Sequence, residues 1–177
     1  MKSFVHLFAS MLALTSLQAQ TRATDTAAQP TQRLAFSQHC FWTGEMKLGE
    51  IDGVIRTEAG FIEGHEVTLV DYDPGRVSLE ALVTRAKQAG VADRIHLPVG
   101  SASVSSIAGV SIGAPLDRSY RAASANDQKK QLEGTPYTRF KLTPEQATKV
   151  NAFVRVDPAR AREWLTAPQR ETLTSTH

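Results

Sequence analysis

The sequence predicts a mixed α/β domain, because strand patterns and helix patterns alternate along it. Residues 54–62 and 65–72 are rich in β-branched and aromatic side chains, which is typical of strands. Glu63 and Gly64 between them fit a two-residue hairpin turn, in which glycine adopts the positive φ that the turn requires. Helix signals lie on both sides of this hairpin. We therefore expect a sheet with flanking helices.

The hairpin register and the preceding segment complete the first half of the fold. A two-residue turn at 63–64 would place Phe61 opposite Glu66 across the strand pair. Residues 34–36 indicate a short buried strand, and a helix should follow from Cys40 to about Gly49.

Later segments are marked by helix caps. Ser78 is a typical N-cap, and Gly90 would end the helix that it starts. The apolar face of this helix would consist of Leu79, Leu82, Val83 and Ala86. Residues 97–115 are dominated by small side chains, so we expect mostly a loop there, although the β-branched residues could form a strand.

The C-terminal part has three helix starts. Thr143 to Gln146 form a capping box with proline at the first helical position. Asp157 and Pro158 start a second helix, and Thr166 to Gln169 repeat the cap pattern. The buried side chains of the first two helices would be Ala147, Val150, Phe153, Val154, Ala161, Trp164 and Leu165.

Composition suggests how the 177 residues are organised. Residues 1–19 combine Lys2, an apolar run and a small residue at a plausible cleavage point, which predicts a signal peptide and export to the periplasm. Residues 20–32 lack large apolar side chains and are typical of a flexible leader. One domain would span residues 33–170, and residues 171–177 would form a frayed tail.

Charge and ligand patterns exclude several classes of function. The formal charge is +2 and falls to +1 without Lys2, and the basic residues are scattered. We therefore expect no nucleic-acid partner and no stable membrane insertion of the mature chain, which should be a monomer. His39, His65 and His96 could form a metal site with Cys40 and Glu66, but no pair has a recognised ligand spacing, so no metal and no cofactor are predicted.

Cys40 is the only cysteine in the sequence, so it is a candidate for chemistry. At the first turn of a helix, the unpaired N–H groups and the helix dipole favour a thiolate. Phe41 and Trp42 could form an apolar wall beside it. The alternative is an ordinary buried cysteine. Glu66 is either a solvated carboxylate at a hairpin end or an acid held in a site.

The order of these motifs resembles the A-type peptide methionine sulfoxide reductases. The resemblance covers about residues 34–146 and is looser between 90 and 134. It rests on Cys40-Phe41-Trp42, Asp52-Gly53-Val54-Ile55, Gly60-Phe61, Gly64-His65-Glu66-Val67, Tyr72-Asp73-Pro74, Gly134-Thr135-Pro136-Tyr137 and Leu142-Thr143-Pro144-Glu145-Gln146.

The resemblance implies a split β-α-β sheet in a compact form and a reduction of methionine S-sulfoxide. Cys40 would attack the sulfoxide sulfur, while Glu66 would protonate the oxygen and Tyr137 would donate a hydrogen bond to it. The family also implies substrate-binding roles for Phe41, Trp42, Phe61 and His65. The substrate would be methionine sulfoxide, in proteins or as the free amino acid.

The sequence departs from the family pattern at the site. His39 replaces a glycine, Phe61 a tyrosine and Leu132 an aspartate, and the hairpin is unusually short, which should open the cleft. Without a second cysteine, the Cys40 sulfenic acid would need an external reductant, either a thioredoxin-like dithiol protein or a small thiol. Two alternatives stay open: a catalytically silent binding protein of this family, and a one-cysteine protein that reduces or senses peroxide.

Overall fold

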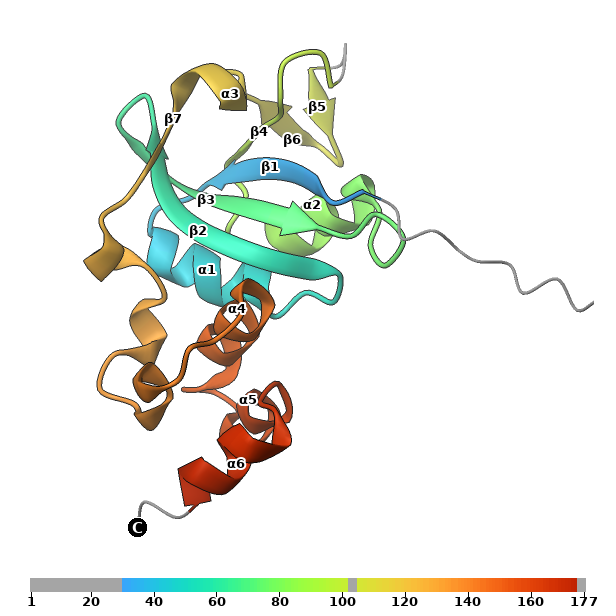
Figure 1. Ribbon diagram of the computed structural model, residues 1–177. Helices are drawn as coiled ribbons and strands as arrows, with labels where there is room; N and C mark the ends of the chain where they lie inside the picture. The colour runs from blue at the N-terminus through green and yellow to red at the C-terminus, as the bar shows by residue number, and fades with distance from the viewer. Residues whose placement is uncertain (1–29, 102–104, 175–177) are drawn as a thin grey trace, which may run out of the picture.

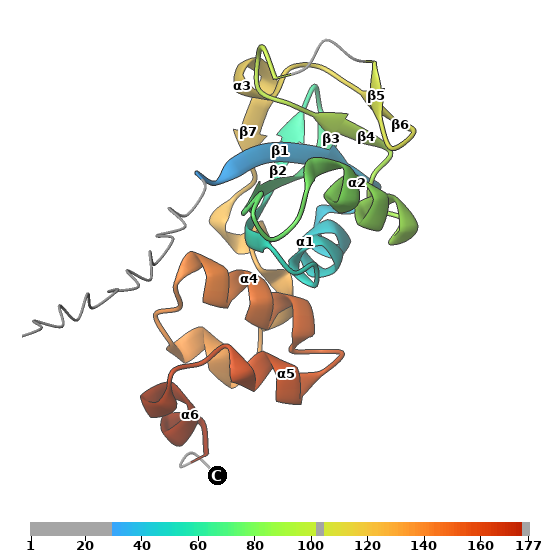
Figure 2. The same cartoon turned by 90° about the vertical axis from the view of Figure 1, so that its right-hand side faces the viewer.

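The computed structural model describes residues 30–101 and 105–174. Its centre is a seven-stranded sheet in the order β5-β6-β4-β1-β3-β2-β7. Helices α1 and α2 lie on the same side of this sheet, and the C-terminal helices α4, α5 and α6 extend beyond α1 (Figures 1 and 2).

The elements follow each other along the chain with these bounds. The strands are β1 Gln32–Ser37, β2 Val54–Ile62, β3 His65–Tyr72, β4 Arg94–His96, β5 Ser106–Ile107, β6 Val110–Ile112 and β7 Tyr120–Ala122. The helices are α1 Phe41–Gly49, α2 Leu79–Gln88, α3 Leu116–Ser119, α4 Pro144–Phe153, α5 Pro158–Glu163 and α6 Ala167–Thr174, with 3-10 turns at η1 Ala125–Asp127, η2 Lys130–Leu132 and η3 Pro136–Arg139.

Two interleaved split β-α-β units build the sheet. β1 and β2 are joined through α1 and both pair antiparallel with β3, so β3 lies between them. β3 and β4 are joined through α2 and both pair antiparallel with β1. This is a ferredoxin-like β-α-β-β-α-β arrangement. The predicted α/β class with a split β-α-β sheet is confirmed.

The hairpin between β2 and β3 has the predicted turn and register. Glu63 and Gly64 have φ values of 50° and 81°, the positive values of a type I′ turn. Phe61 lies opposite Glu66 in the ladder, as expected. The side chains of these two residues therefore share one face of the sheet, the face that carries α1.

The main core lies between the sheet and its two helices. Leu34, Phe36 and Val70 from the strands pack with Leu48 of α1 and Leu82 of α2, and all five are fully buried or nearly so. A second cluster joins α4 and α5, where Val150, Phe153, Ala161 and Leu165 are buried as predicted. Ala147 of α4 is only partly buried.

The predicted helix caps are present. The Ser78 side chain accepts the Ala81 N–H at the start of α2, and Thr143 and Gln146 form the reciprocal capping box of α4. The Asp157 side chain accepts the Arg160 N–H in α5. At α6, the Gln169 side chain accepts the Thr166 N–H.

The described residues of the stretch 97–115 are mostly loop, as expected, with two short strands among them. β5 and β6 lie within this stretch, and β6 pairs in parallel with β4, a strand that the sequence did not indicate. These strands have two or three residues each, too few for an alternating pattern. Their pairing with β1 and with each other comes from tertiary packing instead.

The domain boundaries differ slightly from the prediction. β1 begins at Gln32, which the prediction placed in the leader, because Gln32 pairs with Tyr72 in the β1–β3 ladder; its side-chain carbonyl also accepts the Tyr72 hydroxyl at 2.6 Å. α6 continues past residue 170 to Thr174. Almost all of the predicted signal peptide and leader, residues 1–29, lies outside the described residues. Within the described part, no helix is both long and apolar enough to cross a membrane.

Lys149 of α4 ties the C-terminal end of α1 to the rest of the molecule. Its side chain is 1% exposed, and its Nζ donates to the carbonyl oxygens of Gly49 at 2.8 Å and Ile51 at 2.7 Å. Burial lowers the pKa of Lys149 to about 8. A cation at this end complements the negative end of the helix dipole.

His96 joins three segments at the edge of the sheet. Its Nδ1 donates to the Ala114 carbonyl at 2.8 Å, so in the neutral ring Nε2 accepts the Ser37 hydroxyl at 2.7 Å. The ring lies so close to Gly113 that a Cβ there would come within 2.6 Å of it. Burial lowers the pKa of His96, because the charged ring would lose its hydration.

We predict that His96 makes the protein sensitive to acid. In the unfolded chain, His96 takes up a proton near pH 6.5, whereas its pKa in the folded protein is lower. The neutral, buried ring therefore contributes fully to stability above pH 6.5. This contribution is lost as the pH falls through the lower pKa of the folded protein. Urea unfolding between pH 7.5 and 5 should therefore show a smaller loss of stability for His96→Gln than for the wild type. At pH 7.5, the variant should be less stable by about 1–2 kcal/mol. Parallel pH profiles for the two proteins would contradict this account.

Candidate active site around Cys40 and Glu66

Cys40 is the N-cap residue of α1. Its backbone is extended, with φ −141° and ψ 118°, and its carbonyl accepts the Gly44 N–H at 3.0 Å to begin the helix. Its thiol makes no capping hydrogen bond, and the residue is half-exposed. Cys40 thus lies at the N-terminal end of α1, as predicted.

Glu66 is held directly beside Cys40. Its Oε2 accepts the N–H of Phe41, the residue after the cysteine, at 2.8 Å. Its backbone carbonyl accepts the N–H of Gln38, two residues before the cysteine, at 3.3 Å. β3 therefore contacts the chain on both sides of Cys40, and the Glu66 carboxylate lies beside the Cys40 backbone.

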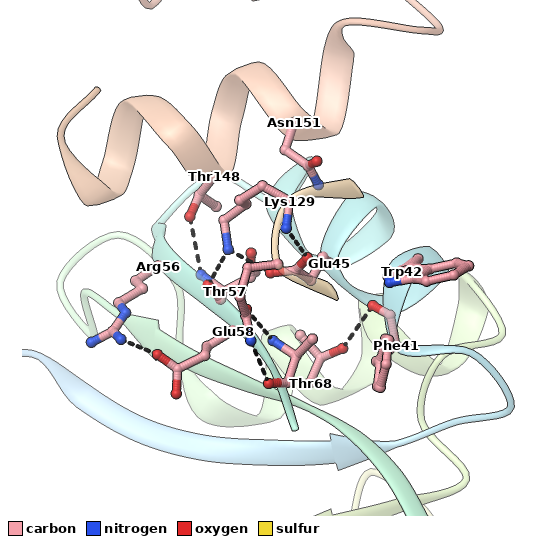
Figure 3. A network of polar contacts seen from close by, with 12 residues as sticks. Phe41, Trp42, Glu45, Arg56, Thr57, Glu58, Thr68, Lys129, Thr148 and Asn151 are labelled. Atoms are coloured by element: carbon pink, nitrogen blue, oxygen red, sulfur yellow. Dashed lines mark hydrogen bonds and ion pairs between the residues drawn. The ribbon is translucent and has the colours of Figure 1, made fainter. Parts of the chain in front are cut away.

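The fit of α1 onto β3 depends on a glycine. A Cβ at Gly44 would come within 2.2 Å of the Thr68 hydroxyl oxygen and 2.9 Å of the Gln38 side chain. The Thr68 hydroxyl in turn donates to the Phe41 carbonyl at 3.3 Å (Figure 3). Gly44 thereby allows the first turn of α1 to lie against β3. This close approach lets the Glu66 side chain accept the Phe41 N–H.

Three aromatic rings adjoin this thiol–carboxyl pair. Phe41 packs edge-on against Trp42 at 5.9 Å and against Phe61 at 5.6 Å between ring centroids. Phe41 is 6% exposed and contacts Ala59 and Ala123, so it serves mainly as the base of the cluster. Trp42 and Phe61 are only partly buried and offer the accessible apolar surface.

A polar cavity of about 440 Å³ borders Glu66. Gln38, His39 and Glu66 line it together with the hairpin turn and β4. His65 also borders this cavity and is exposed, but the alternation along β3 places it on the opposite sheet face from Glu66. A substrate contact from His65 therefore stays a prediction.

A buried ion pair supports the middle of α1 (Figure 3). The Glu45 side chain is fully buried and accepts the Lys129 backbone N–H at 2.7 Å, and its carboxylate also pairs with the Lys129 ammonium. The Lys129 Nζ donates to the Thr57 carbonyl at 2.5 Å. The sequence gives no sign of this network, because Glu45 and Lys129 are 84 positions apart and carry no shared motif.

Segment 123–128 covers the aromatic rings. The Trp42 indole N–H donates to the Asp127 carbonyl at 3.0 Å. The Gln128 side chain accepts the Ala59 N–H and donates to the Ala59 carbonyl, both at 2.9 Å, so it extends the edge of β2. These bonds fix the segment beside Phe41 and Trp42.

The tyrosines lie away from the site. Tyr72 donates its hydroxyl to Gln32, and Tyr120 donates to Glu58 at 2.7 Å on the opposite sheet face. Tyr137, predicted to bind the sulfoxide oxygen, is 5% exposed and packs in the α4–α5 cluster. Tyr137 borders a different cavity from Glu66, one that it shares with Gln128 and Lys129, so its bond to the sulfoxide oxygen stays a prediction.

The metal alternative finds no support in the geometry. Within residues 30–101 and 105–174, no group of three or more His, Cys, Asp or Glu side chains could hold an ion. Both ring nitrogens of His96 already have protein partners.

No family model matches the chain. The chain is 38% identical over 69 residues to peptide methionine sulfoxide reductase MsrA 1 of Rhizobium meliloti (strain 1021). This alignment covers 29% of this chain and 32% of that protein. It is also 42% identical over 43 residues to a peptide methionine sulfoxide reductase of Fragaria ananassa. This second alignment covers 24% of this chain and 22% of that protein.

Among solved structures, methionine sulfoxide reductase A of Corynebacterium diphtheriae aligns with a TM-score of 0.47 and 18% identity. The alignment covers 67% of this chain and 84% of that one. The two sequence matches support the predicted relationship to the A-type methionine sulfoxide reductase family. The chain aligns with about a third or less of the length of these curated relatives.

We predict that Gly44→Ala destabilises the protein although alanine is the better helix former. Alanine in a helix interior usually adds about 1 kcal/mol relative to glycine. Here its Cβ would overlap Thr68 and Gln38, and such overpacking typically costs about 1–3 kcal/mol. Urea denaturation of both proteins measures the difference.

The matched control is Thr43→Ala, one residue earlier in α1 and exposed. It should leave stability unchanged or slightly higher, because only helix propensity changes. A stabilised Gly44→Ala variant would mean that α1 does not lie against β3 as described.

Proposed function

We propose that this protein reduces methionine S-sulfoxide to methionine, with Cys40 as the nucleophile and Glu66 as the acid. The observation that carries the proposal is the hydrogen bond from the Phe41 amide to Glu66, which fixes a carboxyl group beside a half-exposed thiol at a helix start. The sequence relationship to reductases that bear this name supports the same reaction.

The first step joins the thiol to the substrate. The Cys40 thiolate attacks the sulfoxide sulfur, and the oxygen takes up a proton as its bond to sulfur weakens. In the net reaction, the sulfoxide oxygen passes from the substrate to Cys40. Methionine leaves, and Cys40 is oxidised to a sulfenic acid.

Glu66 is placed to supply the proton. One of its oxygens, Oε2, is occupied by the Phe41 N–H, which orients the carboxyl group. The other oxygen can carry the proton toward the sulfoxide oxygen. Trp42 and Phe61 would hold the apolar end of the substrate, because their rings are only partly buried beside this pair.

The catalytic cycle then requires a reductant from outside the chain. Two thiol groups return the sulfenic acid to a thiol, forming a disulfide and water. The 177 residues contain no second cysteine for this step, so a dithiol protein or a small thiol would supply both. We further propose that the protein acts after export, on the basis of the signal-peptide pattern in residues 1–19.

A second candidate function is binding of methionine sulfoxide without turnover. Position 61 carries no phenol, and the hydroxyls of Tyr72 and Tyr120 bond elsewhere while Tyr137 is buried among the C-terminal helices. Stabilisation of the developing negative charge on oxygen would then depend on Glu66 alone. This observation favours a slow or silent member of the family.

We predict that the protein with dithiothreitol consumes the S epimer of N-acetyl-methionine sulfoxide, but neither the R epimer nor hydrogen peroxide at a comparable rate. Chromatography of the product measures each reaction. Cys40→Ser should abolish turnover, and Glu66→Gln should lower kcat at least about 100-fold, the usual contribution of a general acid. The amide oxygen introduced by Glu66→Gln would still accept the Phe41 N–H, so this variant should retain its fold.

The controls separate the alternatives. Glu63→Gln removes a neighbouring carboxylate from the hairpin turn and should leave turnover unchanged. Saturable binding without turnover would establish the second candidate. Consumption of peroxide alone would contradict both.

A further inference from the structure

Arg121 extends the row of side chains that begins at Glu66. In the ladder, Arg121 of β7 lies opposite Phe61 of β2, and Phe61 lies opposite Glu66 of β3. Residues directly opposite each other point to the same side of a sheet. The three side chains therefore line up across three strands on the face that carries α1, with Phe61 in the middle.

The guanidinium of Arg121 is positioned but not neutralised. Its Cζ lies 4.8 Å from the centroid of the Phe61 ring, a cation–π stack that orients the side chain. Arg33 and Arg56, by contrast, pair with Asp71 and Glu58 on the opposite face. Within the part of the chain that the structure describes, no acidic side chain forms an ion pair with Arg121, which is exposed.

We infer that Arg121 binds a carboxylate of the substrate, an inference that rests on the proposed function. Neighbouring strands lie about 4.8 Å apart, so two strand spacings separate Arg121 from Glu66. In methionine sulfoxide, three carbon atoms separate the sulfur from the α-carboxyl carbon. With the sulfoxide at Glu66 and the methylene groups over Phe61, a carboxylate reaches the guanidinium, whose planar N–H groups match it in pairs.

Two substrates carry this chemistry. One is methionine sulfoxide with a free α-carboxylate, either as the amino acid or at a chain end. The other is an internal methionine sulfoxide next to an acidic residue. Lys130, which stacks on Trp42 at 5.3 Å, is a weaker candidate for this role because it already pairs with Glu133.

The test compares substrates that differ only in the carboxylate. The specificity ratio is kcat/KM for N-acetyl-methionine S-sulfoxide divided by that for its neutral methylamide. Arg121→Gln should lower this ratio roughly threefold to tenfold, mainly through KM, and Arg121→Lys should restore part of it. Arg85→Gln, an exposed arginine on α2, is the matched control and should leave the ratio unchanged. An unchanged ratio in Arg121→Gln would exclude the free α-carboxylate as the group that Arg121 binds.

Peptides distinguish the two carboxylate sources. For a peptide with methionine sulfoxide beside aspartate, kcat/KM should depend on Arg121 only if a side-chain carboxylate is accepted. For the same peptide with asparagine, kcat/KM should not depend on Arg121. Dependence in either the free-carboxylate or the aspartate arm supports the inference, and dependence in neither contradicts it.

A binding measurement separates this inference from the proposed reaction. Titration of the Cys40→Ser protein with N-acetyl-methionine sulfoxide and with the methylamide requires no chemistry. Arg121→Gln in that background should weaken binding of the carboxylate ligand by a similar factor. If the wild type shows no turnover but this difference is found, the reductase proposal fails and the carboxylate subsite stands. Equal affinities for the two ligands in both proteins would exclude binding of the α-carboxylate at Arg121, and the aspartate peptide would then decide whether a carboxylate subsite exists.

Discussion

The hydrogen bond between the Phe41 amide and the Glu66 carboxylate is the contact on which the site depends. It joins the first turn of α1 to the start of β3 at the residue that follows Cys40. Hydrogen bonds to charged groups stabilise a fold by about 1.5–3 kcal/mol when well formed. Its larger consequence is positional, because thiol and carboxyl come from segments 26 residues apart yet meet at one helix end.

The remainder of α1 is fixed to support that contact. Gly44 allows close approach to Thr68, the buried Glu45 pairs with Lys129, and Lys149 holds the carbonyl of Gly49 at the far end. The helix is thus held at its beginning, middle and end by three different segments. A helix of nine residues would be marginal alone, so these tertiary contacts are what place Cys40.

Local signals in the sequence predicted much of this structure. The turn at Glu63 and Gly64, the caps at Ser78 and Thr143, and the opposition of Phe61 and Glu66 follow from short-range chemistry, and each is present. The nearness of Glu66 to Cys40 followed from the resemblance to a family, since no local pattern connects the two. The sequence did not indicate strand β4 and did not fix the positions of β5 and β6, because distant partners set their pairing.

The site residues also fall into two groups, those that a local motif identified and those that only the structure shows. Cys40, Phe41 and Trp42 are contiguous, so one motif found them all. Tyr137 matched a motif, but η3 packs its ring among Val150 and Phe153 of the C-terminal helices. Arg121 and Lys129 carry no motif, and only the three-dimensional arrangement shows that they flank α1 and the aromatic rings. Sequence therefore identified the candidate nucleophile, and the structure identified what surrounds it.

A single-turnover measurement tests the central claim most directly. The fully reduced protein, freed of added thiol, is mixed with methionine S-sulfoxide, and the products and the intact protein mass are determined. Our account predicts at most one methionine released per chain and one oxygen atom gained at Cys40, trapped as a sulfenic acid by dimedone. Methionine release without oxidation of Cys40, or no release from folded and reduced protein, would contradict it.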